Sequence, residues 1–235
     1  MKTVIVAAGM GSRLWRKTYT IPKTLLPFGD GTILSTIMDN FHKAGISEFV
    51  LVVGYQANYI IDYLNQNDYL GYKVEFVNND NWNKGNGLSV LAAEPATGAN
   101  EFILSMSDHI VSLTALDRIV KQDSQHNLLL VDPRIAEIYD IDDATKVELQ
   151  ERKIINIGKE IEKYNAVDCG IFKLTNRYFA AMRKALESGQ DSISAAINEL
   201  IKDGDMEAVL MNASEKWIDI DTPDAYRHSL KDLDY

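Results

Sequence analysis

The alternation of short apolar runs with amphipathic stretches is the feature that most constrains how this chain can fold. In the first half, short apolar runs such as Val4-Ile5-Val6 are typical of buried strands. The stretches between them carry apolar residues at helical spacing, and the first has Thr32 as its expected N-cap and Gly45 as its end. Strand followed by helix in this rhythm predicts an α/β fold with a doubly wound, mostly parallel sheet and helices on both faces. The expected strands are 4–6, 49–53, 73–77, 102–105 and 128–131, and the expected helices lie at 33–41, 58–66, 88–93 and 113–122.

The pattern changes at about Ala144. Short strands with short connections are expected there, as in a smaller mixed sheet, and two helical runs, a further strand and a closing helix follow. No internal repeat and no linker rich in Pro, Gly or Ser divides the sequence. We therefore expect residues 1–235 to form a single domain, with 1–143 as one half and 144–235 as the other. The expected elements of the second half are strands at 146–149, 154–157, 167–174 and 208–211, helices at 177–187 and 193–202, and a helix after Pro223.

Charge and cysteine content exclude several classes of protein. The chain has 34 acidic and 24 basic residues and a formal net charge of −10, which argues against a surface made to hold nucleic acid or an anionic membrane. The single cysteine, Cys169, excludes an internal disulfide and a cysteine-rich zinc site, and it fits a reducing cytoplasm. The apolar run at 3–8 is far shorter than the ~20 residues that span a bilayer.

A glycine-rich loop follows the first strand and reads Ala7-Ala8-Gly9-Met10-Gly11-Ser12-Arg13. In an open α/β sheet, ligands bind at the carboxyl ends of the strands. Glycines let the backbone approach a phosphate, and Arg13 adds a forked cationic donor. Leu14 stands where a dinucleotide fingerprint has its third glycine, and the loop lacks the ending of a Walker loop. A plain strand-to-helix turn is the alternative, but a second cation in the same loop, Lys23, favours phosphate binding.

Three aspartates are candidates for a metal site. Asp108 follows the strand at 102–105, where a carboxylate is well placed to hold Mg²⁺ that bridges phosphate oxygens. Asp219 and Asp221 lie on one face of an extended segment because side chains alternate along a strand. A helix cap is the alternative for Asp108, and Asp221, followed by Thr-Pro, also fits the start of a helix.

Other polar residues carry weaker signals. Lys159, at the end of an expected strand hairpin, is by itself typical of a solvated surface lysine. The four histidines show no paired spacing for zinc, and Cys169 fits a buried small side chain better than a nucleophile.

Taken together, the loop at 7–13 and Pro22-Lys23 resemble the N-terminal motif of sugar-phosphate nucleotidyltransferases, over about 1–230 of the chain. The resemblance implies a Rossmann-like α/β fold with a small mixed-strand lobe that binds the acceptor. On this basis 1–143 would be mainly the nucleotide-binding half, and 144–235 the acceptor-binding lobe and closing elements. Within the superfamily the chain is most similar to CTP:inositol-1-phosphate cytidylyltransferases. The stretches that carry this likeness are Asn86-Gly87-Leu88-Ser89, Met106-Ser107-Asp108-His109, Ala144-Thr145-Lys146-Val147, Ile157-Gly158-Lys159 and Asn165-Ala166-Val167-Asp168-Cys169-Gly170.

The resemblance also implies residue roles. Arg13 would bind the β and γ phosphates of the nucleotide, and Lys23 the α phosphate and the incoming phosphate. Lys159 would bind the acceptor's phosphate, and Asp168 its hydroxyls. These are expected to be the catalytic and acceptor-binding side chains. The expected Mg²⁺ ligands are Asp108, Asp219 and Asp221, and the expected nucleotide-binding residues are Ala7, Ala8, Gly9, Gly11 and Gly87.

The resemblance predicts Mg²⁺-dependent transfer of CMP from CTP to inositol-1-phosphate, which gives CDP-inositol and pyrophosphate. Many sugar-nucleotide enzymes have glycine where this chain has Asp221, and the extra carboxylate favours the cytidylyltransferase branch. Bacterial phosphocholine cytidylyltransferases and other sugar-1-phosphate nucleotidyltransferases are the alternatives. A non-catalytic regulatory subunit is disfavoured because Arg13, Lys23, Asp108 and Asp219 are all present. A dehydrogenase is disfavoured by Leu14 and by the absence of an acidic residue after the second strand.

The expected partners are CTP and a small phosphorylated polyol or sugar, without nucleic acid and without membrane insertion. The expected location is the cytoplasm. Related cytidylyltransferase domains often precede a synthase that acts on the CDP product. Since the sequence ends near Tyr235, such a synthase is expected to be a separate chain or to have been cut away.

Overall fold

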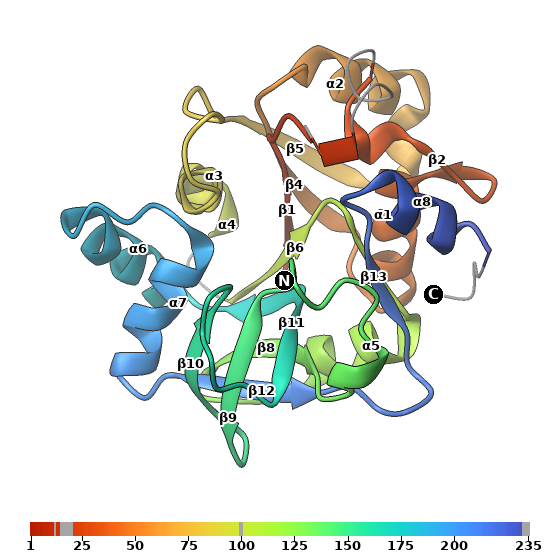
Figure 1. Cartoon of the computed structure of the whole chain (residues 1–235). Coiled ribbons are helices and arrows are strands. Elements are labelled where there is room, and N and C mark those ends of the chain that lie inside the picture. The colour runs from red at the N-terminus through yellow and green to blue at the C-terminus, as the bar shows by residue number, and fades with distance from the viewer. Residues whose placement is uncertain (12, 15–20, 99–100, 232–235) are drawn as a thin grey trace.

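The structure, a computed structural model, describes residues 1–11, 13–14, 21–98 and 101–231. Within these residues, nine strands form one sheet in the order β5-β4-β1-β6-β11-β8-β12-β10-β9 (Figure 1). The strands are β1 Thr3–Ala7, β4 Glu48–Val53, β5 Lys73–Asn78, β6 Phe102–Met106, β8 Asn127–Asp132, β9 Lys146–Gln150, β10 Lys153–Gly158, β11 Ala166–Leu174 and β12 Met206–Leu210. The helices are α1 Ile33–Lys43, α2 Ala57–Gln66, α3 Gly87–Ala92, α4 Glu94–Thr97, α5 Leu113–Lys121, α6 Arg177–Glu187, α7 Ile193–Lys202 and α8 Pro223–Ser229.

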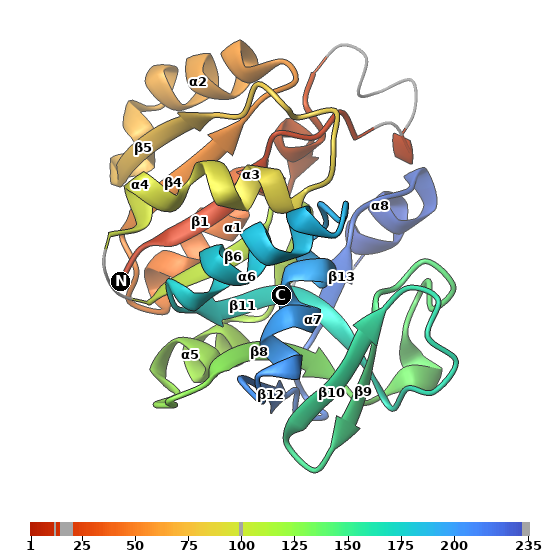
Figure 2. The same ribbon diagram turned by 90° about the vertical axis from the view of Figure 1, so that its left-hand side faces the viewer.

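Strand β1 shows why the sheet is covered on both faces. Its side chains alternate between two separate apolar clusters, so that Ile5 packs on one face and Val4 and Val6 on the other. Apolar residues of α1, α2 and α5 belong to the first cluster, and those of α3, α6 and α7 to the second. Helices therefore cover both faces of the sheet (Figures 1 and 2). The predicted doubly wound α/β fold is confirmed.

The prediction of a mostly parallel sheet with a separate small mixed sheet requires a correction. Strands β5, β4, β1 and β6 run parallel to one another, but β11 runs antiparallel to both β6 and β8, and β9 and β10 form an antiparallel hairpin. The second-half strands extend the same nine-stranded sheet, which is mixed. The physical reason is connection length, because a parallel pair needs a long crossover whereas β9 and β10 are joined by a two-residue turn.

Helix α1 begins and ends where its sequence predicts. The Thr32 hydroxyl accepts a hydrogen bond from the backbone N–H of Ser35 at 3.1 Å, and the Ser35 hydroxyl accepts one from the N–H of Thr32 at 2.8 Å. This reciprocal cap satisfies two donors that the first helical turn leaves unpaired. After the helix, Gly45 adopts a φ of +97°, which glycine tolerates better than any residue with a side chain.

Two short strands complete the region beyond β6, and the sequence predicted one of them only as an extended segment around Asp219. Strand β7 (His109–Val111) pairs antiparallel with β13 (Trp217–Asp219), and Asp219 lies opposite His109. A second small pair, β2 (Pro27–Phe28) and β3 (Gly31–Thr32), precedes α1. No helix in the described ranges is both long enough and apolar enough to cross a bilayer.

Candidate active site

Two adjoining cavities open beside the carboxyl ends of β1 and β6. The larger has a volume of about 380 Å³ and the smaller about 250 Å³. Their position agrees with the expectation that ligands bind at the carboxyl ends of strands. The residues that line both cavities are Arg13, Asn86, Met106, Asp108 and Asp221.

The glycine-rich loop forms one wall of the smaller cavity through Ala7, Gly9 and Gly11. Gly11 has a φ of +61°, and an added Cβ would lie 3.0 Å from Cβ of Lys23. This position therefore requires glycine both for its backbone conformation and for close packing against the lysine. Ala8 is buried, and its carbonyl oxygen accepts a hydrogen bond from the N–H of Tyr55 at 2.9 Å. Ala8 supports the loop from behind and does not line either cavity.

Lys23 is the central cation of the site. Its ammonium group contacts the carboxylates of Asp108 and Asp221, and only 11% of its side chain is exposed. Burial alone would lower the pKa of Lys23, but the neighbouring carboxylates outweigh it and raise the pKa above its ordinary value. The lysine is therefore held in its charged form, as a ligand for phosphate oxygens must be.

Asp108, His109 and Asp219 form a second, partly buried group. Nδ1 of His109 lies 2.8 Å from Oδ1 of Asp108 and 3.7 Å from Oδ1 of Asp219. Burial favours the neutral form of Asp108, yet Lys23 and His109 hold its pKa well below the ordinary range. Burial and the nearby charges of Asp108 and Asp221 raise the pKa of Asp219 to about 7. Burial would lower the pKa of His109, but the surrounding carboxylates raise it to about 9.

A carboxylate that the sequence analysis missed, Asp143, joins two of the predicted phosphate-binding cations. Its Oδ1 lies 2.8 Å from Nζ of Lys159, and its Oδ2 contacts the guanidinium of Arg13. Arg13 also contacts Asp221. Burial alone would raise the pKa of Asp143, but hydrogen bonds from Lys159 and Arg13 lower it. Asp143 lies in an acidic stretch between strands, and nothing in its local pattern distinguishes it from solvated neighbours.

Asp168 reaches the larger cavity from an irregular stretch of β11. The pairing of β11 with β8 shifts register between Asp168 and Phe172. Oδ1 of Asp168 accepts a hydrogen bond from the N–H of Gly170 at 2.6 Å. Burial raises the pKa of Asp168 to about 6, although this hydrogen bond and the charge of His109 oppose the shift. The predicted acceptor-binding residues Lys159 and Asp168 both line this cavity.

Gly87 has a different environment from the one expected of a nucleotide-binding residue. It is buried, and its N–H donates to the carbonyl of Asp191 at 3.0 Å. An added Cβ would lie 2.5 Å from Sδ of Met182 and 2.7 Å from the carbonyl oxygen of Asp191. Gly87 therefore lets α3 pack against the turn before α7. Its neighbours Asn86 and Ser89 line the smaller cavity instead.

The acidic residues fit a divalent cation. Oδ1 of Asp219 is buried and has no hydrogen-bond partner among the described residues, as expected of an oxygen that a ligand would contact. Donor atoms of Asp108, His109 and Asp219 lie within 4.8 Å of one another, and so do those of Asp143, Asp219 and Asp221. Carboxylate oxygens are the ligands that hard divalent cations prefer. Asp219 belongs to both groups. Together the two groups contain all three predicted ligands, and they also contain His109 and Asp143.

Comparison with known proteins identifies the family. Residues 2–234 match the sequence profile described as nucleotidyl transferase. The chain belongs to the nucleotidyl transferase family. The prediction of a nucleotidyltransferase enzyme is thus confirmed, and with it the family resemblance seen in the glycine-rich loop and Lys23.

Among its relatives is the bifunctional IPC transferase and DIPP synthase of Archaeoglobus fulgidus, 29% identical over 99% of this nucleotidyltransferase and 44% of the relative. The bifunctional protein GlmU of Methanococcus aeolicus is 30% identical over 99% of this chain and 55% of the relative. The chain thus spans about half the length of the curated relatives it matches. The solved structure of the inositol-1-phosphate CTP transferase from T. maritima is 26% identical, with a TM-score of 0.86 over 99% of this chain and 95% of that one.

Proposed function

We propose that this nucleotidyltransferase is a Mg²⁺-dependent cytidylyltransferase that transfers CMP from CTP to inositol-1-phosphate and gives CDP-inositol and pyrophosphate. The observation that carries the proposal is the placing of Arg13, Lys23 and Lys159 along two adjoining cavities, each in contact with a carboxylate. The names of two relatives, an IPC transferase and an inositol-1-phosphate CTP transferase, support this choice of nucleotide and acceptor.

The two cavities suggest how the substrates are divided. The smaller cavity, with the glycine-rich loop and Trp82, would take the nucleotide. The larger, with Lys159 and Asp168, would take the acceptor. Arg13 lines both cavities, and it would bind the β and γ phosphates of CTP at their junction. This division agrees with a nucleotide-binding half at 1–143 and an acceptor-binding half at 144–235 within one domain.

The proposed reaction needs no general base. A phosphate monoester is mostly dianionic at pH 7, since its second pKa is about 6. One of its oxygens would attack the α-phosphorus of CTP in line, and the bond between the α-phosphorus and the bridging oxygen would break as pyrophosphate leaves. Lys23 would hold the attacking phosphate and the transferring phosphoryl group together, and Arg13 would bind the departing phosphates. The carboxylates of Asp108, Asp219 and Asp221 would hold Mg²⁺, which supplies further neutralisation of phosphate charge.

The choice of a polyol over a quaternary ammonium group rests on Asp168. Asp168 presents a carboxylate to it, and such a group recognises hydroxyls strongly because a wrong ligand leaves it unpaired. Phosphocholine would call for an aromatic box. Of the two tyrosines suited to one, Tyr139 lines the larger cavity and stacks on His228, which lines it too, with ring centroids 4.6 Å apart. Tyr164 lies under Nζ of Lys146 and is outside the described lining of the cavity. Phosphocholine cytidylyltransferase and other sugar-1-phosphate nucleotidyltransferases are the competing assignments.

Pyrophosphate release, measured with each of the four NTPs against inositol-1-phosphate, phosphocholine and several sugar-1-phosphates, tests the proposal. We expect CTP with inositol-1-phosphate to give the highest kcat/KM, at least about tenfold above phosphocholine, a difference of ~1.4 kcal/mol. Lys23→Ala is the inactive control. A preference for phosphocholine with CTP would overturn the inositol assignment, and no release with any pair would overturn the catalytic one.

Two further proposals follow from the relatives and the composition. Because the matched relatives named IPC transferase and DIPP synthase are bifunctional, we propose that a synthase consumes the CDP product. The single cysteine, Cys169, is buried, and we propose a reducing, cytoplasmic location.

A further inference from the structure

Four hydrogen bonds converge on the carboxylate of Asp132, the last residue of β8, which is only 2% exposed. Its Oδ1 accepts from the backbone N–H and from Nε of Arg134, both at 2.9 Å. Its Oδ2 accepts from Nη2 of Arg134 at 2.8 Å and from Nε1 of Trp217 at 3.0 Å. Burial would raise the pKa of Asp132, but these hydrogen bonds lower it. The carboxylate is thus ionised, and both of its oxygens are used.

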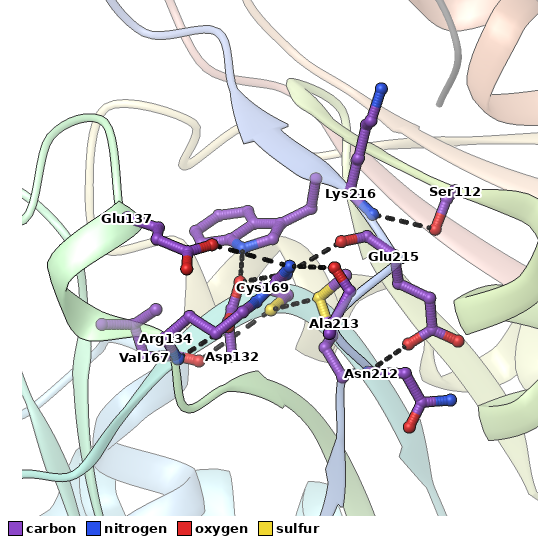
Figure 3. A network of polar contacts seen from close by, with 12 residues as sticks. Ser112, Asp132, Arg134, Glu137, Val167, Cys169, Asn212, Ala213, Glu215 and Lys216 are labelled. Atoms are coloured by element: carbon purple, nitrogen blue, oxygen red, sulfur yellow. Dashed lines mark hydrogen bonds and ion pairs between the residues drawn. The ribbon is translucent and has the colours of Figure 1, made fainter.

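Arg134 continues this network into the segment that leads to β13. Its Nη1 donates to the carbonyl of Ala213 at 3.0 Å, and its Nη2 donates to the carbonyl of Glu215 at 2.8 Å (Figure 3). The side chain of Glu215 in turn accepts from the N–H of Asn212 at 2.7 Å and from Arg118. Side chains therefore hydrogen-bond to the backbone of segment 212–216 near both of its ends.

Strand β13 needs such support because its own ladder is short. It has three residues and pairs with β7 in a two-stranded sheet, an arrangement that is marginally stable in water. Asp132 belongs to the nine-stranded sheet, so its bonds to Arg134 and Trp217 attach β13 to the rigid part of the fold. Trp217 and Asp219 lie on the same face of β13, and Ile218 points into the core on the other.

Through Trp217, the network reaches His109, a residue of the candidate site. The indole of Trp217 stacks on the imidazole of His109, with ring centroids 5.8 Å apart and planes inclined by 18°. Asp132, Arg134 and Trp217 all line the larger cavity, and none of them lines the smaller. We propose that Asp132 and Arg134 are positioning residues that fix the indole of Trp217 as a wall of the larger cavity and thereby set how well the acceptor fits. This inference rests on the proposed function, which assigns that cavity to the acceptor.

The ¹⁹F NMR spectrum of the protein labelled with 5-fluorotryptophan tests the positioning without any turnover. The chain has three tryptophans, and Trp217→Phe assigns the resonance of interest. Arg134→Lys keeps the charge but cannot reproduce the forked bond to Asp132. We expect it to shift the Trp217 resonance and to leave the other two unchanged. Arg183→Lys, which alters an exposed ion pair with Glu94, is the matched control and should shift none.

Steady-state kinetics then tests the effect on the acceptor. We expect Arg134→Lys and Trp217→Phe each to raise the KM for inositol-1-phosphate at least about fivefold, the scale of one typical hydrogen bond. The KM for CTP should change less than about twofold. Because Arg134 acts through Trp217, adding Arg134→Lys to Trp217→Phe should have little further effect.

An unchanged Trp217 resonance in Arg134→Lys would overturn the positioning role, and additive effects of the two substitutions would overturn the route through Trp217. Equal rises in both KM values would show that the network serves the whole site rather than the acceptor. Asp132→Asn, which leaves one acceptor oxygen for two partners, repeats the spectral test should Arg134→Lys fold poorly. If the wild type releases no pyrophosphate with any acceptor, the proposed function fails, and the spectra of the free protein still decide the positioning of Trp217.

Discussion

The imidazole of His109 lies so close to Gly170 that a Cβ added to the glycine would stand 2.4 Å from Cδ2 of the ring. Gly170 also has a φ of +75°, which residues with side chains rarely adopt. Glycine at this position thus lets β11 approach β7 and places His109 between the acidic residues of the site. Neither the conformation nor the contact tolerates a larger residue.

Gly170→Ala is therefore expected to destabilise the protein and to impair catalysis. Gly189 provides a matched control, because it has the same φ of +75° but no atom within 4 Å of an added Cβ. Gly189→Ala should show the cost of backbone strain alone, about 1 kcal/mol. Gly170→Ala should add about 1–3 kcal/mol for the clash with His109. Urea unfolding measures both, and equal losses of stability would contradict the contact.

Asp108→Ala and Asp219→Ala are expected to lower kcat to less than about a tenth of the wild-type value, a loss of more than ~1.4 kcal/mol of transition-state stabilisation. The reason is that both carboxylates are proposed Mg²⁺ ligands and lie in the partly buried group around His109. Asp117→Ala, which removes an exposed carboxylate paired with Lys121, should leave kcat unchanged. Thermal melts would verify that each variant folds. A folded variant that keeps more than a tenth of kcat would remove that aspartate from the metal site.

The two lysines are expected to differ in their kinetic effects. Lys159 lines only the larger cavity, so Lys159→Ala should raise the acceptor KM far more than the KM for CTP. Lys23 is in contact with Asp108 and Asp221, so Lys23→Ala should depress kcat as well. Initial rates measured with each substrate varied in turn separate these outcomes. Weaker CTP binding with an unchanged acceptor KM in Lys159→Ala would show that the larger cavity does not hold the acceptor.

Asp168 is expected to make stability depend on pH. Its pKa in the folded protein is about 6, above the ordinary 3.8, so the folded state binds the proton more tightly than the unfolded state. This contribution to stability is present below about pH 4 and is lost as the pH rises through 6. At higher pH the buried charge costs up to about 3 kcal/mol.

Asp168→Asn removes this charge but keeps an oxygen that can accept the N–H of Gly170. We expect the variant to melt at a higher temperature than the wild type at pH 7.5, and the difference to shrink at pH 4. The same substitution should raise the KM for inositol-1-phosphate, since a carboxylate for its hydroxyls is lost. A Tm difference that does not vary with pH would show that Asp168 titrates normally in the folded protein.

Local sequence determined much of this protein. The continuous apolar run Val4-Ile5-Val6 is enough to predict a strand covered on both faces, and the Thr32 cap marks the start of α1. These patterns are readable because each depends on residues within a few positions of one another. The two glycines and Lys23 of the first loop likewise predicted a phosphate site, and the cavities lie beside that loop.

Tertiary structure alone decided which distant side chains meet. Asp143 contacts Arg13 across 130 positions of sequence, and nothing near Asp143 marks it as different from a solvated carboxylate. Gly87 is a second example, because glycine is needed there for close packing against Asp191 and Met182 of α6, which are distant in sequence. The pairing of β7 with β13 also lay outside the sequence patterns, which predicted an extended segment around Asp219 but not the strand that pairs with it. Sequence thus determined the elements and the chemical groups at their ends, whereas the long-range packing of the mixed sheet determined their partners, charges and exposure.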